Sequence, residues 1–167
     1  MLFKPTIWIK NVFQIDKKLL YKLGVRGLIL DLDNTLSTHG NPNAEPGVPE
    51  WLECLRQLGV KMYIVSNNYE ERVAPLAKNL NLGFISFGLK PLPFGIRKGV
   101  RALNKHGIPK SQVAIVGDQI FTDIMGGNLY GIKSILVEPF ETEEYFSFKA
   151  KRKIEDLVFK RDFSKLN

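Results

Sequence analysis

The stretch VRGLILDLDNTL, residues 25–36, joins a short apolar run to a pair of aspartates. Residues 25–30 are largely apolar, which predicts a buried strand. Side chains two positions apart on an extended chain point the same way, so Asp31 and Asp33 should face one side. Two carboxylates this close repel each other unless a cation or a shared proton compensates. An acidic turn that caps the next segment is the alternative, and it accounts for one aspartate but not for the pair.

Short apolar runs alternate with helical patterns along the rest of the chain. Strands are predicted at residues 25–30, 60–65, 83–87, 113–116 and 135–137, and helices at 51–58, 70–79, 93–106, 122–130 and 145–159. This alternation predicts an α/β fold, a three-layer αβα Rossmann-like parallel sheet with helices on both faces. Ligands of such sheets bind beyond the carboxyl ends of the strands, which is where the aspartate pair falls.

Polar side chains also follow three of the other predicted strands. Ser66 and Asn67 come directly after the second strand, Lys90 follows the third, and Asp118 and Asp123 follow the fourth. Each alone has an ordinary explanation, such as turn chemistry for Ser66 or a solvated charge for Lys90. Together they would converge on one crevice, and an oxygen-only ligand set without a Cys/His cluster suits Mg²⁺. Carboxylates, a hydroxyl, a lysine and Mg²⁺ are the parts that phosphoryl transfer requires.

Length and composition indicate one globular domain. The chain has 167 residues, of which 44% are hydrophobic and 25% charged, which excludes a disordered chain. We expect a single domain over residues 1–167, with a catalytic core at about 25–140, a basic segment at 1–23 and a basic tail at 141–167. The single Cys54 cannot form an internal disulfide, and no apolar run is long enough to span a membrane. We therefore expect a cytoplasmic protein.

The net charge of +7 is concentrated at the two ends of the chain. Residues 1–26 carry six Lys/Arg against one acid, and residues 147–167 carry seven against three. Both ends also hold aromatic residues, and aromatic-plus-basic surfaces bind anionic membranes. The alternative is that these aromatic residues pack under the edge of the sheet. No nucleic-acid-binding motif appears, so we do not expect nucleic acid as a partner.

Four ordered motifs resemble those of the haloacid dehalogenase (HAD) superfamily of phosphatases. They are DLDNTL at 31–36, VSNN at 65–68, LKP at 89–91 and GDQIFTD at 117–123. In finer features the chain is similar to the YqeG family of class IIIA phosphatases, which resembles the mitochondrial phosphatidylglycerophosphate phosphatase. The resemblance implies a Mg²⁺-dependent phosphomonoester hydrolase acting on phosphatidylglycerophosphate, with the enzyme at the membrane surface.

The resemblance also implies a role for each motif residue. Asp31 would be the nucleophile and Asp33 the general acid and base. Mg²⁺ would be held by Asp31, the backbone carbonyl of Asp33, and Asp118, with Asp123 either as a further ligand or as a support for the other ligands. The four residues between Asp118 and Asp123 are one of the spacings that the superfamily tolerates.

Three other residues receive supporting roles from the same resemblance. Ser66 would bind a phosphoryl oxygen with help from the Asn67 backbone. Lys90 would offset charge on the nucleophile and on the transferring phosphoryl group. Thr35 would brace the turn after Asp31.

The segments between the motifs are too short for a cap domain. Residues 37–49 and the twenty-three residues between Ser66 and Lys90 leave room for little more than a helix and a strand. An open site suits a bulky substrate such as a lipid head group. The alternatives are a phosphatase of a soluble metabolite, a nucleotide or a phosphoprotein, and a non-catalytic phosphate-binding or scaffold protein.

Overall fold

A computed structural model describes residues 2–140 of the chain. Its strands are β1 (Ile7–Ile9), β2 (Gly27–Leu30), β3 (Lys61–Val65), β4 (Gly83–Ile85), β5 (Val113–Gly117) and β6 (Lys133–Val137). Its α-helices are α1 (Lys17–Leu23), α2 (Val48–Gln57), α3 (Glu70–Asn79), α4 (Pro93–Asn104) and α5 (Met125–Tyr130). The predicted tail helix at 145–159 lies outside the described residues.

The strands form one parallel sheet in the order β1-β6-β5-β2-β3-β4. After the edge strand β1, the chain enters the middle of the sheet at β2. It then adds β3 and β4 on one side of β2 and crosses over to add β5 and β6 on the other side. The carboxyl end of β2 therefore lies at the point where the direction of winding changes, which is the ligand-binding crevice of such sheets. The predicted α/β parallel sheet is confirmed.

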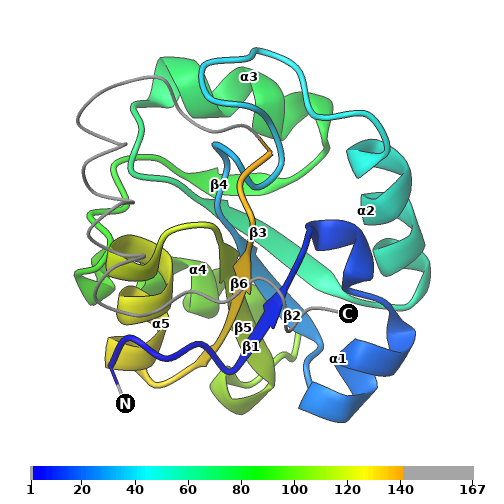
Figure 1. Ribbon diagram of the computed structural model, residues 1–167, viewed down its shortest axis with the longest axis vertical. Coiled ribbons are helices and arrows are strands. Elements are labelled where there is room, and N and C mark those ends of the chain that lie inside the picture. The colour runs from blue at the N-terminus through cyan, green and yellow to red at the C-terminus, as the bar shows by residue number, and fades with distance from the viewer. Residues whose placement is uncertain (1, 141–167) are drawn as a thin grey trace.

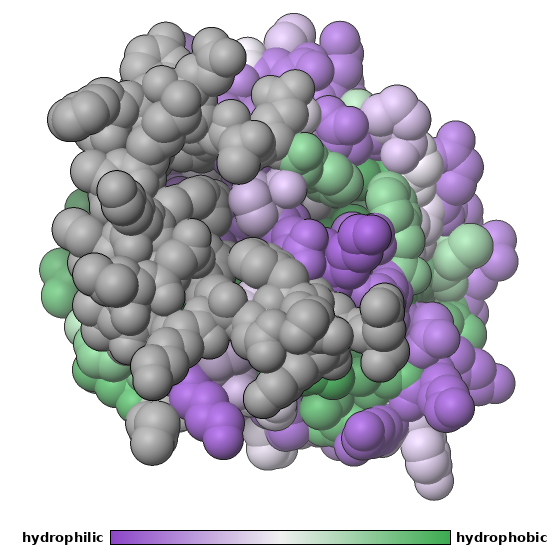
Figure 2. Space-filling view, viewed as in Figure 1, coloured by the Kyte–Doolittle hydropathy of each residue, from purple (hydrophilic) through white to green (hydrophobic). Residues whose placement is uncertain are grey.

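Helices cover both faces of this sheet, so the fold has three layers (Figure 1). Apolar side chains of α1, α2 and α3 form one core with Leu28, Leu30 and Ile64 of the sheet. On the other face Ile96, Val100 and other residues of α4 pack on the sheet. The surface over α1, α2 and α3 is largely hydrophilic in Figure 2, as expected for helices whose apolar sides face the sheet.

Helix ends follow local sequence signals. Asp16 caps α1 by accepting a hydrogen bond from the Leu19 N–H at 2.8 Å, and Gly24 ends this helix with a φ of 61°. The predicted helix at 122–130 is divided in two, because a π-helical turn at Ile120–Ile124 precedes α5. This wide turn begins two residues after Asp118.

The N-terminal segment contributes to the sheet, which the sequence patterns did not predict. Residues Ile7–Ile9 pair with β6 as its edge neighbour, and α1 follows. Ile9, Val12 and Ile15 are buried in the core beside α1 and α2, and Trp8 is half-buried. These residues therefore pack against the fold, as the packing alternative for the N-terminal end proposed. The basic tail at 141–167 lies outside the described residues.

The described part of the chain has no cap domain. A loop joins β2 to α2, and α3 alone separates β3 from β4. None of the described helices is both long enough and apolar enough to cross a bilayer.

Candidate active site

Three buried carboxylates meet at the carboxyl ends of β2 and β5. Asp31 follows β2, Asp118 follows β5, and Asp123 lies in the π-helical turn. One carboxylate oxygen from each lies within 4.8 Å of the others. Asp118 and Asp123 are fully buried and Asp31 nearly so. Such a cluster of negative oxygens could hold a metal ion, because a cation offsets the repulsion among buried carboxylates.

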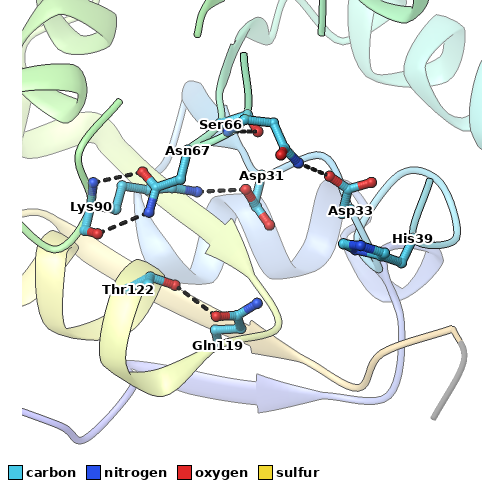
Figure 3. Close-up of a pocket in the computed structure, with 9 residues that line it drawn as sticks. Asp31, Asp33, His39, Ser66, Asn67, Lys90, Gln119 and Thr122 are labelled. Atoms are coloured by element: carbon cyan, nitrogen blue, oxygen red, sulfur yellow. Dashed lines mark hydrogen bonds and ion pairs between the residues drawn. The ribbon is translucent and has the colours of Figure 1, made fainter. Parts of the chain in front are cut away.

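Lys90 supplies one positive charge to this cluster. Its ammonium nitrogen lies 2.5 Å from Asp31 Oδ1 and 2.6 Å from Asp123 Oδ1, and its side chain is almost completely buried. Burial alone would lower the pKa of Lys90, but the carboxylates of Asp123 and Asp31 hold it above its ordinary value. Lys90 therefore stays charged, and its side chain runs to Asp31 in the crevice (Figure 3).

One lysine does not balance three carboxylates. Burial, together with the negative charge of Asp123, raises the pKa of Asp31 to about 8, and the opposing effect of Lys90 is smaller. The raised pKa of Asp31 indicates that one lysine does not offset the negative charge buried around it. This excess of buried negative charge, with oxygen as the only ligand atom, fits a hard divalent cation such as Mg²⁺.

Gly117 gives Asp123 the space to approach the cluster. A Cβ at position 117 would lie 2.2 Å from Cγ of Asp123, well inside van der Waals contact. The Asp123 carboxylate also accepts a hydrogen bond of 3.2 Å from the Gln119 N–H. The π-helical turn and the glycine together bring Asp123 back beside Asp118 despite the four residues between them.

Asp33 lies in the same cavity as Asp31 but has different partners. Arg72 of α3 donates to Asp33 Oδ1 at 2.6 Å, and the side-chain amide of Asn68 donates to Oδ2. The Gly40 N–H lies 3.3 Å from Oδ1. The carboxylate is therefore held on both oxygens, beside His39 (Figure 3).

Ser66 and Asn67 follow β3, and Asn67 lies on the side of Asp31 away from Asp33 (Figure 3). Ser66 is buried, and its hydroxyl accepts a hydrogen bond from the Asn68 N–H at 3.1 Å. The Asn67 side chain accepts from the Lys90 N–H at 2.7 Å and donates to the Lys90 carbonyl at 2.9 Å. Asn67 thus fixes the main chain of Lys90, a function that the sequence did not indicate.

The turn after Asp31 is closed by its backbone. The Leu32 carbonyl accepts from the N–H groups of Thr35, Leu36 and Ser37 at 2.9–3.3 Å. Thr35 is fully buried, and its hydroxyl has no hydrogen-bond partner among residues 2–140. The predicted role of Thr35 in bracing this turn therefore stays a prediction, because its hydroxyl makes no hydrogen bond to the described residues.

These groups surround a cavity of about 230 Å³. Every predicted site residue lines it except Thr35, Asp118 and Asp123. It is lined by Asp31, Asp33, His39, Ser66, Asn67, Asn68, Lys90, Gln119 and Thr122. Sequence patterns did not indicate His39, Gln119, Thr122 or the Arg72 that holds Asp33. Asn68, Gln119 and Thr122 lie inside the quoted motifs, whereas Arg72 and His39 lie in segments with no distinguishing pattern.

Comparison with known proteins agrees with this arrangement. Residues 42–131 match the family of haloacid dehalogenase-like hydrolases. The chain is 37% identical over 153 residues to "Probable phosphatase YqeG" of Bacillus subtilis, covering 92% of this chain and 87% of that one. It is 30% identical to "Phosphatidylglycerophosphate phosphatase 1, chloroplastic" of Chlamydomonas reinhardtii, over 91% of this chain but 59% of that one.

A solved structure shows the same fold. The 4-nitrophenylphosphatase of Thermotoga maritima aligns with a TM-score of 0.57 at 16% identity, over 72% of this chain and 88% of that one. The chain therefore belongs to the haloacid dehalogenase-like hydrolases. Within this family it is a phosphatase of the kind that includes the Bacillus subtilis relative.

Proposed function

We propose that the chain is a Mg²⁺-dependent phosphomonoester hydrolase that works through a phosphorylated Asp31 and dephosphorylates phosphatidylglycerophosphate. The observation that carries the reaction is the lysine-bridged carboxylate cluster, in which Asp31 alone both belongs to the buried triad and lines the cavity. A nucleophile needs access to the substrate, and Asp31 is the member of the triad that has it.

The ligand set supports Mg²⁺ at this cluster. Asp31, Asp118 and Asp123 would hold the ion through carboxylate oxygens, together with the backbone carbonyl of Asp33. When bound, Mg²⁺ supplies positive charge that offsets the phosphoryl oxygens and the buried carboxylates. Burial and the negative charge of Asp123 raise the pKa of Asp31, which is the direction expected where buried carboxylates need a cation.

The reaction has two half-reactions that the chain's own residues carry out. An oxygen of the Asp31 carboxylate forms a bond to phosphorus, and the bond from phosphorus to the leaving alcohol oxygen breaks. Asp33 gives its proton to that oxygen. Water then attacks phosphorus, Asp33 takes a proton from the water, and the bond to Asp31 breaks to release phosphate. Asp33 can serve both steps because the proton moves in opposite directions.

Other residues that line the cavity would bind the phosphate group of the substrate. The Ser66 hydroxyl and the Asn67 backbone would donate to the phosphoryl oxygens, and Lys90 would offset their charge. Arg72 and Asn68 hold Asp33, which sets the direction in which its carboxyl group can exchange a proton.

Two observations support the lipid substrate. The Chlamydomonas relative carries the name of a phosphatidylglycerophosphate phosphatase, although this chain spans only about three fifths of its length. The site also lacks a cap among the described residues, where a loop joins β2 to α2 and α3 alone lies between β3 and β4. An uncapped site admits a head group that remains attached to its lipid.

The test is phosphate release with Mg²⁺ from phosphatidylglycerophosphate in mixed micelles, beside soluble sugar phosphates, nucleotides and a phosphopeptide. We expect kcat/KM for the lipid to exceed that for every soluble ester. A preference for a soluble ester would retain the reaction and overturn the lipid substrate. Absence of release from all of them would overturn the enzymatic proposal in favour of a phosphate-binding protein.

A further inference from the structure

The segment Phe87–Phe94, here called the apolar loop, exposes four large apolar side chains. Phe87, Leu89, Leu92 and Phe94 are 62%, 55%, 51% and 58% exposed. Single exposed apolar residues are common on protein surfaces, but four within eight residues form a patch. Tyr69, which follows the cavity residue Asn68, is also 57% exposed.

The apolar loop is held in place by its main chain. The Phe87 N–H donates to the Asn68 carbonyl at 2.9 Å, and the Gly88 N–H donates to the Ser66 carbonyl at 2.8 Å. At the other end Gly95 contacts Gly88 so closely that a Cβ at 95 would lie 2.4 Å from the Gly88 carbonyl oxygen. A loop fixed in this way cannot turn its apolar side chains inward, so they remain available to a partner.

The apolar loop also contains Lys90, which ties it to the reacting groups. The Lys90 side chain runs inward to Asp31 while its neighbours Leu89 and Leu92 are exposed (Figure 3 shows the inward course of Lys90). The Asn67 side chain fixes the Lys90 main chain on both sides. A partner that binds the apolar loop would therefore lie at the mouth of the cavity.

The chain on both sides of the apolar loop carries mainly positive charge, and the exposed acids nearest to it in the sequence are Glu70 and Glu71 at the start of α3. From Arg72 to Gly117 the sequence contains eight Lys/Arg and no Asp or Glu. On α4 the exposed residues Arg97, Lys98 and Arg101 follow Phe94 at spacings of three, four and seven residues. These spacings place them on one side of the helix with Phe94. An aromatic residue at the end of a basic helical stripe is typical of surfaces that bind anionic bilayers.

We propose that the apolar loop and the basic stripe of α4 (Arg97, Lys98 and Arg101) form a membrane-docking surface for an anionic bilayer. The inference rests on the proposed function, because it explains how a lipid phosphate could reach Asp31 without leaving the membrane. A second copy of the chain fits less well. If two such surfaces met, their positive charges would repel each other, with no acidic residue between Arg72 and Gly117 to compensate.

The test measures binding to vesicles that contain no phosphomonoester, so its outcome does not depend on hydrolysis. Sucrose-loaded vesicles of phosphatidylglycerol and phosphatidylcholine are sedimented with the full chain, beside vesicles of phosphatidylcholine alone. The first variant carries Leu92→Gln and Phe94→Gln. The second carries Phe87→Asn and Leu89→Asn, because asparagine tolerates the positive φ of 47° and 55° at these positions. Thermal unfolding verifies that both variants fold.

A matched control changes exposed apolar residues at the opposite end of the sheet. Tyr21 and Leu58 line a separate cavity beside the amino ends of β2 and β3, and they are 89% and 45% exposed. Tyr21→Asn with Leu58→Asn should bind vesicles as the wild type does. Arg97→Gln with Lys98→Gln and Arg101→Gln should weaken binding by about fivefold for each charge removed, at low salt.

We expect the wild type to bind the anionic vesicles and each apolar-loop variant to bind about tenfold more weakly or worse. The proposal is overturned if the wild type does not bind, if both variants bind as the wild type does, or if the control loses as much. It is also overturned if the variants convert a dimer to a monomer while vesicle binding is unchanged, since a second copy would then occupy the surface. Retained vesicle binding with no hydrolysis of phosphatidylglycerophosphate would leave docking intact and overturn only the proposed substrate.

Discussion

Arg72 Nη2 lies 2.6 Å from Asp33 Oδ1, which joins α3 to the turn after β2. The same guanidinium lies 3.3 Å from the Ser37 hydroxyl. Both partners of the ion pair have side chains that are mostly buried, at 14% and 12% exposure, so the contact is shielded from solvent. The direction of the Asp33 carboxylate is therefore set in part by a residue outside the four motifs.

Arg72→Gln should lower kcat by about tenfold or more with a smaller change in KM, because Asp33 loses the group that aligns it for proton transfer. Steady-state kinetics on a soluble phosphate ester measure both constants. Lys78→Gln, which changes an exposed cation in the same helix, is the control and should leave both unchanged. An unaltered kcat in Arg72→Gln would show that Asp33 does not need this alignment.

Gly117→Ala should weaken Mg²⁺ binding by about 10–100-fold, because the added Cβ displaces the Asp123 carboxylate from the cluster. Calorimetric titration with Mg²⁺ measures the affinity. Gly59→Ala is a useful control, since its φ of 77° makes that substitution costly to stability while the site is remote from the metal ligands. If Gly117→Ala binds Mg²⁺ as the wild type does, Asp123 is not a ligand.

Mg²⁺ binding should tighten as the pH rises toward 8. Burial and Asp123 raise the pKa of Asp31 to about 8, so at lower pH the ion must displace a proton from this carboxyl group. The affinity should then increase by up to about tenfold per pH unit between about pH 6 and about pH 8. Calorimetry in buffers of different ionisation enthalpy detects the released proton. An affinity independent of pH over this range would contradict the assignment of Asp31 as a ligand.

Without Mg²⁺, the protein should also lose stability as the pH rises. Folded Asp31 keeps its proton up to about pH 8, whereas the unfolded chain releases it near the ordinary pKa of 3.8. The contribution of this group to the free energy of unfolding therefore falls as the pH rises from about 4 to about 8. Asp31→Asn removes that loss and should melt at a higher temperature than the wild type near pH 8 without Mg²⁺. An equal or lower melting temperature for the variant would contradict the claim that burial and Asp123 destabilise the charged form of Asp31.

The sequence predicted the position of a site residue where that residue directly follows an apolar strand. Asp31, Ser66 and Asp118 each follow such a strand directly, so the parallel-sheet prediction also placed them at one edge. Lys90 and Asp123 lie farther from the ends of their strands, so the sequence pattern gave them ordinary alternative explanations and the motif resemblance supplied their roles. Their convergence depends on a loop and a π-helical turn that no periodicity reveals.

Other features left no local signal. Arg72 belongs to a helix whose exposed charges are ordinary, and only the packing of α3 beside β3 and β4 brings it to Asp33. The strand at Ile7–Ile9 is three residues long and ends beside Lys10, so it resembled part of a basic segment. Its assignment depends on pairing with β6, which is more than a hundred residues away.

Phosphate release by Asp31→Asn is the most direct test of the central claim that this carboxylate is the nucleophile. Wild type, Asp31→Asn and the exposed control Glu50→Gln are compared with Mg²⁺ on phosphatidylglycerophosphate in mixed micelles and on a soluble ester. We predict that Asp31→Asn remains folded and loses activity by about 10³-fold or more on any ester that the wild type cleaves, while Glu50→Gln keeps its activity. Turnover by purified Asp31→Asn at a rate near that of the wild type would contradict the account.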